Sequence, residues 1–209
     1  MPVIALVGNK GGAGKTTLSV NLAAGLAKKT SVIVLDADPQ GSAIQWNAFS
    51  DNGSNTVSVL KANGDLSKNL NGLSQEYDYV VVDCPPSVEA PQTISVLEVC
   101  DLAIIPVQPS PVDLWATVHT EKAIQHARKS NANLRAVLVI NQLESRTTLS
   151  RLVRDAVSEI GLPVAKTSLR RRAVFRNSAL EGKNVFEMGR RGIDAAKEID
   201  ELIHEVIKT

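Results

Sequence analysis

Cysteine is scarce in this sequence, and the two that are present, Cys84 and Cys100, show neither a C-x-x-C spacing nor a nearby histidine cluster. Disulfide frameworks and metal-thiolate sites both need closely patterned cysteines. A disulfide is therefore not expected, and we interpret both residues as small buried thiols.

Long apolar runs are also missing, since no stretch approaches the roughly 20 apolar residues of a membrane-spanning helix. The chain starts directly with the strand-like PVIALVG, without the basic region and cleavage site of a signal peptide. We therefore expect a cytoplasmic protein. The 209 residues are enough for one α/β domain and short for two, so a single domain over residues 1–209 is expected.

Aromatic residues make up only 3% of the chain, which argues against a surface that stacks single-stranded bases. The net charge of +1 is small but unevenly distributed. From Lys166 to Arg191 there are 8 basic and 2 acidic residues, and this local excess favours an anionic partner. Basic side chains without a base-reading motif are typical of contacts to nucleic-acid phosphates. The candidates for DNA contact are Arg170, Arg171, Arg172, Arg176, Lys183, Arg190 and Arg191.

Short β-branched apolar runs alternate with helical patterns along the chain. Most runs are continuously apolar, as strands buried on both faces are. The alternation predicts an α/β fold, a mostly parallel β-sheet flanked by helices on both faces. The expected strands are 3–8, 31–36, 56–60, 79–83, 102–107, 136–141 and 164–169, and the expected helices are 15–29, 42–49, 65–75, 91–99, 114–129, 147–160, 171–181 and 192–208.

The stretch GNKGGAGKTT, from Gly8 to Thr17, lies between an expected strand and an expected helix. That is the context of a phosphate-binding loop, in which glycines let several backbone N–H groups point at one anion. It departs from the pattern G-x-x-x-x-G-K-[ST], because Asn9 stands in the first glycine position and a second lysine, Lys10, is present. The residues expected to bind the nucleotide are Gly11, Gly12, Ala13, Gly14, Lys15, Thr16 and Thr17.

Within this loop the roles follow from chemistry. Lys15 can reach the β- and γ-phosphates, the Thr16 hydroxyl can hold Mg²⁺, and Thr17 is placed near the α-phosphate. The helix N-terminus adds a partial positive charge.

Two carboxylate segments follow at the carboxyl ends of expected strands, where ligands of open parallel sheets bind. Asp83 ends YVVVD, which fits a carboxylate that holds Mg²⁺ directly or through water. Asp36 and Asp38 end SVIVLDAD, and strand alternation predicts both on one face. We expect a carboxylate here that orients a water near a γ-phosphate, and we count Asp38 with Thr16 and Asp83 as a candidate Mg²⁺ residue.

Taken together, KGGAGKTT, DADPQGSA and VVVDCPPS resemble the ParA/MinD family of P-loop ATPases, which carry a deviant Walker A motif. The resemblance extends over nearly the whole chain and implies a P-loop NTPase fold of the SIMIBI class, with ATP and Mg²⁺ as cofactors. With QPSPVDLWA (108–116), it is greatest to the small ParA type, which includes ParF-like plasmid-partition proteins and McdA-like carboxysome-positioning proteins.

The resemblance also implies a role for each matching residue. Lys10 matches the signature lysine, which in the family reaches the phosphates of the other subunit in an ATP-bound homodimer. Asp38 resembles the residue that positions the hydrolytic water, Asp83 the Mg²⁺-linked carboxylate and Asn141 an adenine contact. The prolines at 109 and 111 resemble a loop near the nucleotide and the dimer interface.

A ParA-type protein would bind non-specific, nucleoid DNA in its ATP-bound state, and a ParB-like or McdB-like partner would stimulate its hydrolysis. Membrane binding is not expected, because the terminal helix pattern carries five acidic residues where MinD relatives have a basic, bulky membrane-targeting helix.

Two other classes of protein related to the P-loop ATPases are considered as alternatives. One is a metabolic ATP-dependent synthetase or amidotransferase, against which the chain shows no separate substrate segment. The other is an electron carrier like the nitrogenase iron protein, for which the two cysteines do not give a convincing cluster spacing. The sequence does not name the cargo or the partner.

Overall fold

A sheet of six strands forms the centre of the computed structural model, in the order β3-β2-β4-β1-β5-β6. The structure describes residues 2–50, 57–63, 66–73, 75–144, 156–157 and 160–207, with residues 67 and 71 described by their backbone alone. All five strand pairs are parallel, which confirms the expected sheet. The strands are β1 (Val3–Leu6), β2 (Val32–Asp36), β3 (Ser58–Lys61), β4 (Tyr79–Asp83), β5 (Leu102–Val107) and β6 (Arg135–Ile140).

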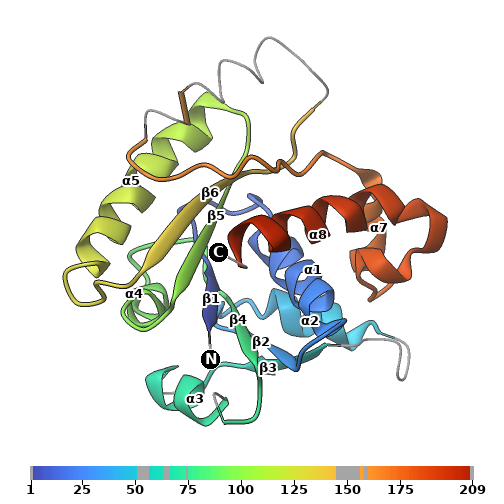
Figure 1. Cartoon of the computed structure of the whole chain (residues 1–209), viewed down its shortest axis with the longest axis horizontal. Coiled ribbons are helices and arrows are strands. Elements are labelled where there is room, and N and C mark those ends of the chain that lie inside the picture. The colour runs from blue at the N-terminus through green and yellow to red at the C-terminus, as the bar shows by residue number, and fades with distance from the viewer. Residues whose placement is uncertain are drawn as a thin grey trace.

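Helices cover both faces of this sheet, as Figure 1 shows. One face carries α1 (Lys15–Ala27), α2 (Ser42–Ala48), α7 (Ala173–Leu180) and α8 (Ile193–Val206), and the other carries α3 (Leu66–Leu73), α4 (Pro91–Leu97) and α5 (Pro111–Ala127). Between α7 and α8 lie two short 3₁₀ helices, η1 (Val185–Glu187) and η2 (Gly189–Arg191).

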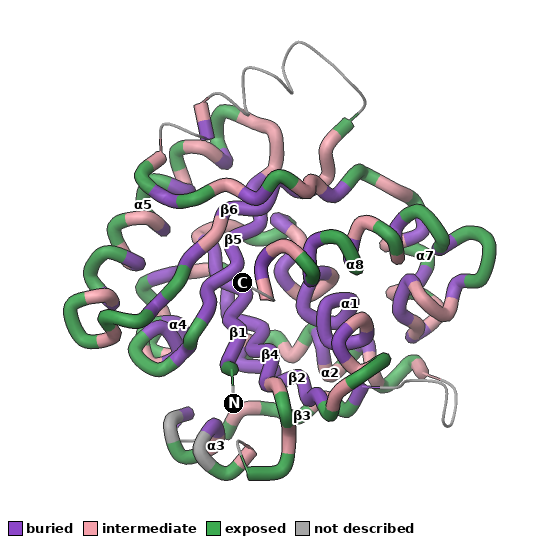
Figure 2. The backbone as a smooth tube through the Cα atoms, in the orientation of Figure 1, coloured by how far each residue is buried: buried purple, intermediate pink, exposed green. Residues whose placement is uncertain are grey.

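The continuously apolar strands reflect this double cover. In β1, Ile4 and Leu6 join the core beneath α1 and α8, whereas Val3 and Ala5 join the core beneath α4 and α5. Successive side chains of a strand face opposite sides, so a strand covered on both faces needs apolar residues at every position. Figure 2 shows the resulting buried band through the centre of the molecule.

The observed elements depart from the expected ones in a few places. Helix α5 begins earlier than expected, because the Ser110 side chain accepts the backbone N–H of Asp113 and Pro111 occupies the first helical turn. The expected strand 164–169 is not a continuous strand. It meets β6 through an isolated bridge between Val164 and Leu138 and through backbone hydrogen bonds such as that from the Leu169 N–H to the Ile140 oxygen at 2.9 Å. Most of the expected helix 147–160 lies outside the described residues.

Both cysteines are free and buried, as expected. Burial raises the pKa of Cys100 to about 12 and also raises that of Cys84, so neither thiol is reactive near neutral pH. In the described part of the chain, no helix is both long enough and apolar enough to cross a bilayer.

The sheet brings the candidate site residues to one edge. Strand β1 lies between β4 and β5, and its last residue, Leu6, is level with Asp83. Asp83 is also level with Asp36 at the end of β2. The phosphate loop leaves β1 at this same carboxyl edge, which is where parallel sheets bind ligands.

Candidate functional site

The loop between β1 and α1 has the backbone of a phosphate cradle. Gly12 and Gly14 adopt φ angles of 77° and 94°, in the left-handed region that favours glycine. A Cβ at Gly14 would also lie 2.3 Å from Nδ2 of Asn141. This position therefore requires glycine, both for its backbone angle and for lack of space. Helix α1 begins immediately after it, at Lys15. The loop therefore ends at a helix N-terminus that favours an anion.

Three side-chain amides pair with carbonyl groups of this loop. Gln108 and Gln142 donate to the Gly12 oxygen at 2.6 and 3.2 Å, and Asn141 donates to the Ala13 oxygen at 2.7 Å. Because carbonyl oxygens repel an anion, pairing them with protein donors favours phosphate binding. The sequence pointed only to Asn141. Gln108 and Gln142 follow the ends of β5 and β6, and that position was the available signal for them.

Lys15 is held within its own loop. Its Nζ donates to the Lys10 carbonyl oxygen at 3.0 Å, and the residue is 7% exposed. Burial lowers the pKa of Lys15, and the carboxylates of Asp83 and Asp38 oppose that change. A triphosphate would supply the negative charge that this buried cation lacks.

Lys10 lies on the outside of the same loop and is 39% exposed in its side chain. Its Nζ donates to Oδ2 of Asp113 at 2.9 Å, and Asp113 is 4% exposed. The Ser110 hydroxyl also donates to this carboxylate. The sequence did not identify Asp113, which lies in the first turn of α5. The two lysines therefore have different surroundings, because one points into the loop and the other pairs with a neighbouring helix.

Asp83 is buried at the end of β4, and one of its oxygens is unpaired. Oδ1 accepts the Ser19 hydroxyl at 3.0 Å, whereas Oδ2 has no hydrogen-bond partner in the described part of the chain. Burial raises the pKa of Asp83 to about 7, and hydroxyls of Thr16 and Ser19 oppose that rise. A buried oxygen without a donor is what a Mg²⁺ ion or its bound water would satisfy. The residues therefore fit Mg²⁺ held by Thr16, Asp83 and phosphate oxygens. Ser19, fully buried on α1, was not predicted.

Asp36 and Asp38 take different positions, although strand alternation predicted one face. Strand β2 ends at Asp36, which accepts the backbone N–H groups of Ala43 and Ile44 at 2.9 and 3.0 Å and so holds the start of α2. Burial raises the pKa of Asp36, against the effect of these N–H donors. Asp38 is half-buried in the turn that follows, and its Oδ1 accepts the Gln40 N–H at 2.9 Å. Asp38 thus remains the carboxylate that is free to approach a ligand.

A cleft of about 1250 Å³ opens beside the phosphate loop. Gly14, Thr17 and Asn141 line it next to the loop, and Arg170, Arg171 and Arg172 line it from the chain segment before α7. The cleft is large enough for a nucleoside beyond the phosphates. These three arginines, predicted as DNA contacts, therefore also border the candidate nucleotide site.

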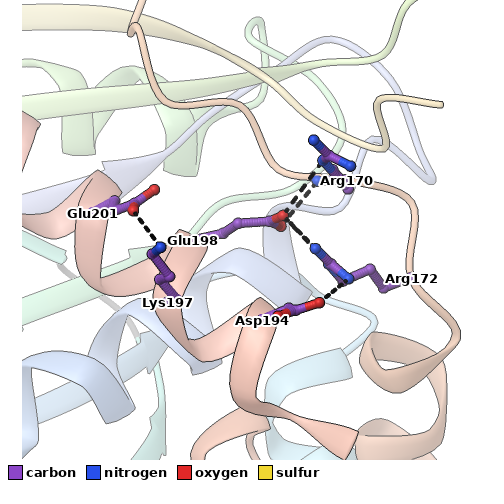
Figure 3. A network of polar contacts seen from close by, with 6 residues as sticks. All are labelled: Arg170, Arg172, Asp194, Lys197, Glu198 and Glu201. Atoms are coloured by element: carbon purple, nitrogen blue, oxygen red, sulfur yellow. Dashed lines mark hydrogen bonds and ion pairs between the residues drawn. The ribbon is translucent and has the colours of Figure 1, made fainter. Parts of the chain in front are cut away.

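The basic region is more neutral in space than along the chain (Figure 3). Arg172 pairs with Glu198 at 2.8 Å and with Asp194 at 3.0 Å, and Glu198 also accepts the backbone N–H of Arg170 at 3.1 Å. Arg171 pairs with Glu144 at 2.6 Å. The hydrogen bond to Glu198 raises the pKa of Arg172. Glu144, which follows β6, and Asp194 and Glu198 on α8 thus neutralise these arginines. All three carboxylates lie outside residues 166–191, over which the excess of basic residues was counted.

The remaining candidates fall into two groups. Lys183 and Arg191 share Glu181, at 3.1 and 3.2 Å. Arg176 and Arg190 are exposed and have no acidic partner among the residues that the structure describes. Among the candidates for DNA contact, the two without an acidic partner in the described chain therefore lie on α7 and η2.

Residues 4–185 match the family described as CobQ/CobB/MinD/ParA nucleotide binding domain, and the chain belongs to this family. A relative from Halothiobacillus neapolitanus, named maintenance of carboxysome distribution protein A, is 44% identical over 206 residues, which cover 98% of this chain and 95% of the relative. Two solved structures are similar in fold. One is the Cyanothece McdA(D38A)–ATP complex, with a TM-score of 0.78 and 16% identity, covering 98% of this chain and 95% of that one. The other is cobyrinic acid a,c-diamide synthase from Mycobacterium smegmatis with ADP and magnesium, with a TM-score of 0.74 and 22% identity, covering 97% and 94%.

Proposed function

We propose that this protein is an ATP-dependent switch that dimerises with ATP, binds DNA without sequence preference and positions a cargo. The observation that carries the proposal is the contrast between the two loop lysines. Lys15 is buried within its own loop, whereas Lys10 is partly exposed and held by the single carboxylate of Asp113. A phosphate group from a second subunit could displace that carboxylate, and ATP binding would then favour the dimer.

The chain's own residues account for ATP binding. The loop N–H groups and Lys15 would bind the phosphates, and the base would occupy the cleft beside Asn141. Mg²⁺, held by Thr16 and by Asp83 directly or through water, would neutralise charge on the β- and γ-phosphates.

Hydrolysis converts ATP and water to ADP and phosphate. Asp38, in the turn after β2, would orient the attacking water, while Asp36 maintains the position of that turn by accepting the Asp38 N–H at 3.1 Å. Basal turnover is expected to be slow, and a ParB-like or McdB-like partner would accelerate it.

The cargo that similarity favours is the carboxysome. The relative whose name refers to carboxysome distribution is 44% identical over nearly the whole chain. The alternative cargo within the same mechanism is a plasmid or a chromosome. In either case the ATP-bound dimer would associate with the nucleoid.

DNA contact would be made through phosphates by the basic residues of both subunits. If a dimer neutralised about six phosphates, the log–log salt slope of binding would be roughly −5. A metabolic synthetase is the competing function, because a diamide synthase shares the fold. Binding of random duplex DNA that requires ATP would favour the switch, whereas no ATP-dependent binding at low salt would favour the synthetase.

Size-exclusion chromatography with light scattering tests the central step. Wild type should become dimeric with ATP and Mg²⁺. Lys10→Ala should still bind ATP but stay monomeric, and Lys29→Ala, which changes an exposed lysine on another surface, should behave as wild type. A Lys10→Ala protein that dimerises as wild type does would remove the role of Lys10 across the dimer.

A further inference from the structure

Two side chains from the nucleotide-binding face hold the backbone of the basic segment that follows α7. Trp46, on α2, donates its Nε1–H to the Lys183 carbonyl oxygen at 3.0 Å. Asn21, on α1, accepts the Val185 N–H at 2.8 Å through its side-chain oxygen. The two bonds are only two residues apart in the segment that they hold. Figure 1 shows α1, α2 and α7 on the same side of the sheet.

Asn21 connects this segment to the phosphate loop. It is fully buried, and its side-chain amide donates to the Thr17 carbonyl oxygen at 2.7 Å, one helical turn earlier in α1. Thr17 borders the candidate nucleotide cleft. A shift at the start of α1 would therefore be passed to Val185 through one rigid side chain.

Trp46 connects the same segment to the turn that carries Asp38. The carboxylate of Asp36 holds the first N–H groups of α2 and also accepts the Asp38 N–H at 3.1 Å. Trp46 lies one turn further along this short helix and is 7% exposed. A change at Asp38 or Asp36 would thus move α2 and, through Trp46, Lys183.

The backbone of the basic segment packs closely against the end of α2, so the two cannot move independently. Gly182 has a φ of 62°, and a Cβ there would lie 2.2 Å from the backbone carbon of Phe49, just beyond α2. The segment is also internally rigid, because Asn184 and Glu187 form a reciprocal capping box across η1. A displacement of one end should therefore reach the other.

The segment held in this way carries basic residues with and without ion-pair partners among the described residues. Lys183 and Arg191 lie in it and share Glu181, Arg190 also lies in it, and Arg176 lies in the helix before it. Arg176 and Arg190 are the two candidates without an acidic partner in the described chain.

We propose that Trp46 and Asn21 are positioning residues that couple the nucleotide state of the phosphate loop and of the Asp38 turn to the basic surface of α7 and η2, which contacts DNA phosphates. The coupling rests on the proposed function, and it adds the route between the two sites. By linkage, DNA bound at this surface would raise ATP affinity by the same factor by which ATP raises DNA affinity.

Trp46→Phe tests the route, because it keeps an aromatic ring in the core and removes the Nε1–H donor together with the second ring of the indole. Trp115→Phe is the matched control, since Trp115 is 71% exposed on α5 and belongs to the opposite face of the sheet. Affinity for a fluorescent random duplex is measured with ATP and with ADP, and ATP affinity is measured without DNA. We expect Trp46→Phe to reduce the ratio of DNA affinity between ATP and ADP by about fivefold, the value of one hydrogen bond, with ATP affinity unchanged. Trp115→Phe should leave the ratio at the wild-type value. An unchanged ratio in Trp46→Phe would overturn the proposal.

Hydrogen–deuterium exchange gives a readout that does not depend on DNA. In wild type, ATP should change the exchange of the peptide covering residues 183–191, and this change should diminish in Trp46→Phe. If wild-type exchange there is insensitive to ATP, the coupling is refuted, even if DNA binding is observed. If that exchange responds to ATP but no DNA is bound, the coupling stands and the DNA-binding function fails. The wild-type exchange experiment also decides the matter if Trp46→Phe does not fold.

Discussion

The phosphate loop and the basic region after β6 are both rich in basic residues, but their cations differ in the partners that they contact. In the loop, each lysine has one defined contact, Lys15 with the Lys10 carbonyl and Lys10 with Asp113. In the basic region, most cations are neutralised by carboxylates from other elements.

The difference shows what a sequence pattern can and cannot determine. A phosphate loop is local, so its glycine spacing specifies its backbone and its neighbours. A charge count along the chain ignores acidic groups that folding brings close, such as Glu198 from α8 against Arg172. Five substitutions, in four experiments, should test or sharpen this contrast.

The largest effect on ATP binding is expected for Lys15→Ala. The residue is buried in the loop, and its removal leaves the phosphates without their closest cation, so ATP affinity should fall by roughly 100-fold or more. Isothermal titration calorimetry measures the loss, with Lys29→Ala as the exposed control. Retained affinity within about threefold would show that the loop N–H groups suffice.

Asp38→Ala should slow hydrolysis without weakening ATP binding. The water loses its positioning carboxylate while the phosphate contacts remain, so a reduction of about 100-fold is expected in the presence of a stimulating partner. Wild type alone should already turn over well below the 1–100 s⁻¹ typical of kinases. A phosphate-release assay measures both, and wild-type turnover in Asp38→Ala would refute the assignment.

Asp83→Asn should alter the pH dependence of stability. Because the folded pKa of Asp83 is about 7 and its usual value is 3.8, the native state binds the proton more tightly than the unfolded state does. The nucleotide-free wild type should therefore lose stability as pH rises from about 4 to 7, by on the order of 4 kcal/mol from this group alone.

Thermal unfolding of both proteins is measured across this pH range. The stability of wild type minus that of Asp83→Asn at each pH isolates the contribution of Asp83 from those of other titrating groups. A difference that does not vary with pH would show that Asp83 is ionised throughout.

The smallest effect is expected at two adjacent arginines of η2. Arg190→Ala should weaken ATP-dependent binding of random duplex DNA by about threefold, and Arg191→Ala by less than about twofold, because Glu181 already neutralises Arg191. The slope of affinity against salt should fall in Arg190→Ala alone. Equal effects at both positions would show that the ion pair does not survive DNA binding.

Much of the fold and of the phosphate site could be predicted because the signals are local. Apolar strands alternating with helices predicted the parallel sheet. The strand–loop–helix context located Lys15, and the end of an apolar strand located Asp83. Segment 164–169 was predicted as a strand from its composition, but it contacts β6 at separate points and forms no continuous strand. Composition alone does not show whether a segment can pair with a sheet edge along its whole length.

The supporting contacts of the site could not be predicted in the same way. Asp113 and Ser19 contact their partners across long sequence separations and carry no spacing rule. Asp36 was expected to share a face with Asp38, but alternation stops where β2 ends, and Asp36 holds the start of α2 instead. The contacts of Gln108 and Gln142 with the phosphate loop follow from the fold, which places the ends of β5 and β6 beside that loop.

The central position of β1 has a consequence for synthesis of the protein. The phosphate motif is synthesised before both strands that flank β1, because Val3 pairs with Val80 and Ile4 with Leu102. At translation rates of ~5–20 residues per second, β1 waits roughly 4–16 s for its first neighbour. During that interval an apolar strand has no sheet to join, and the nucleotide has no site to bind. A bound nucleotide would therefore stabilise the nascent chain only after β4 and β5 have been synthesised.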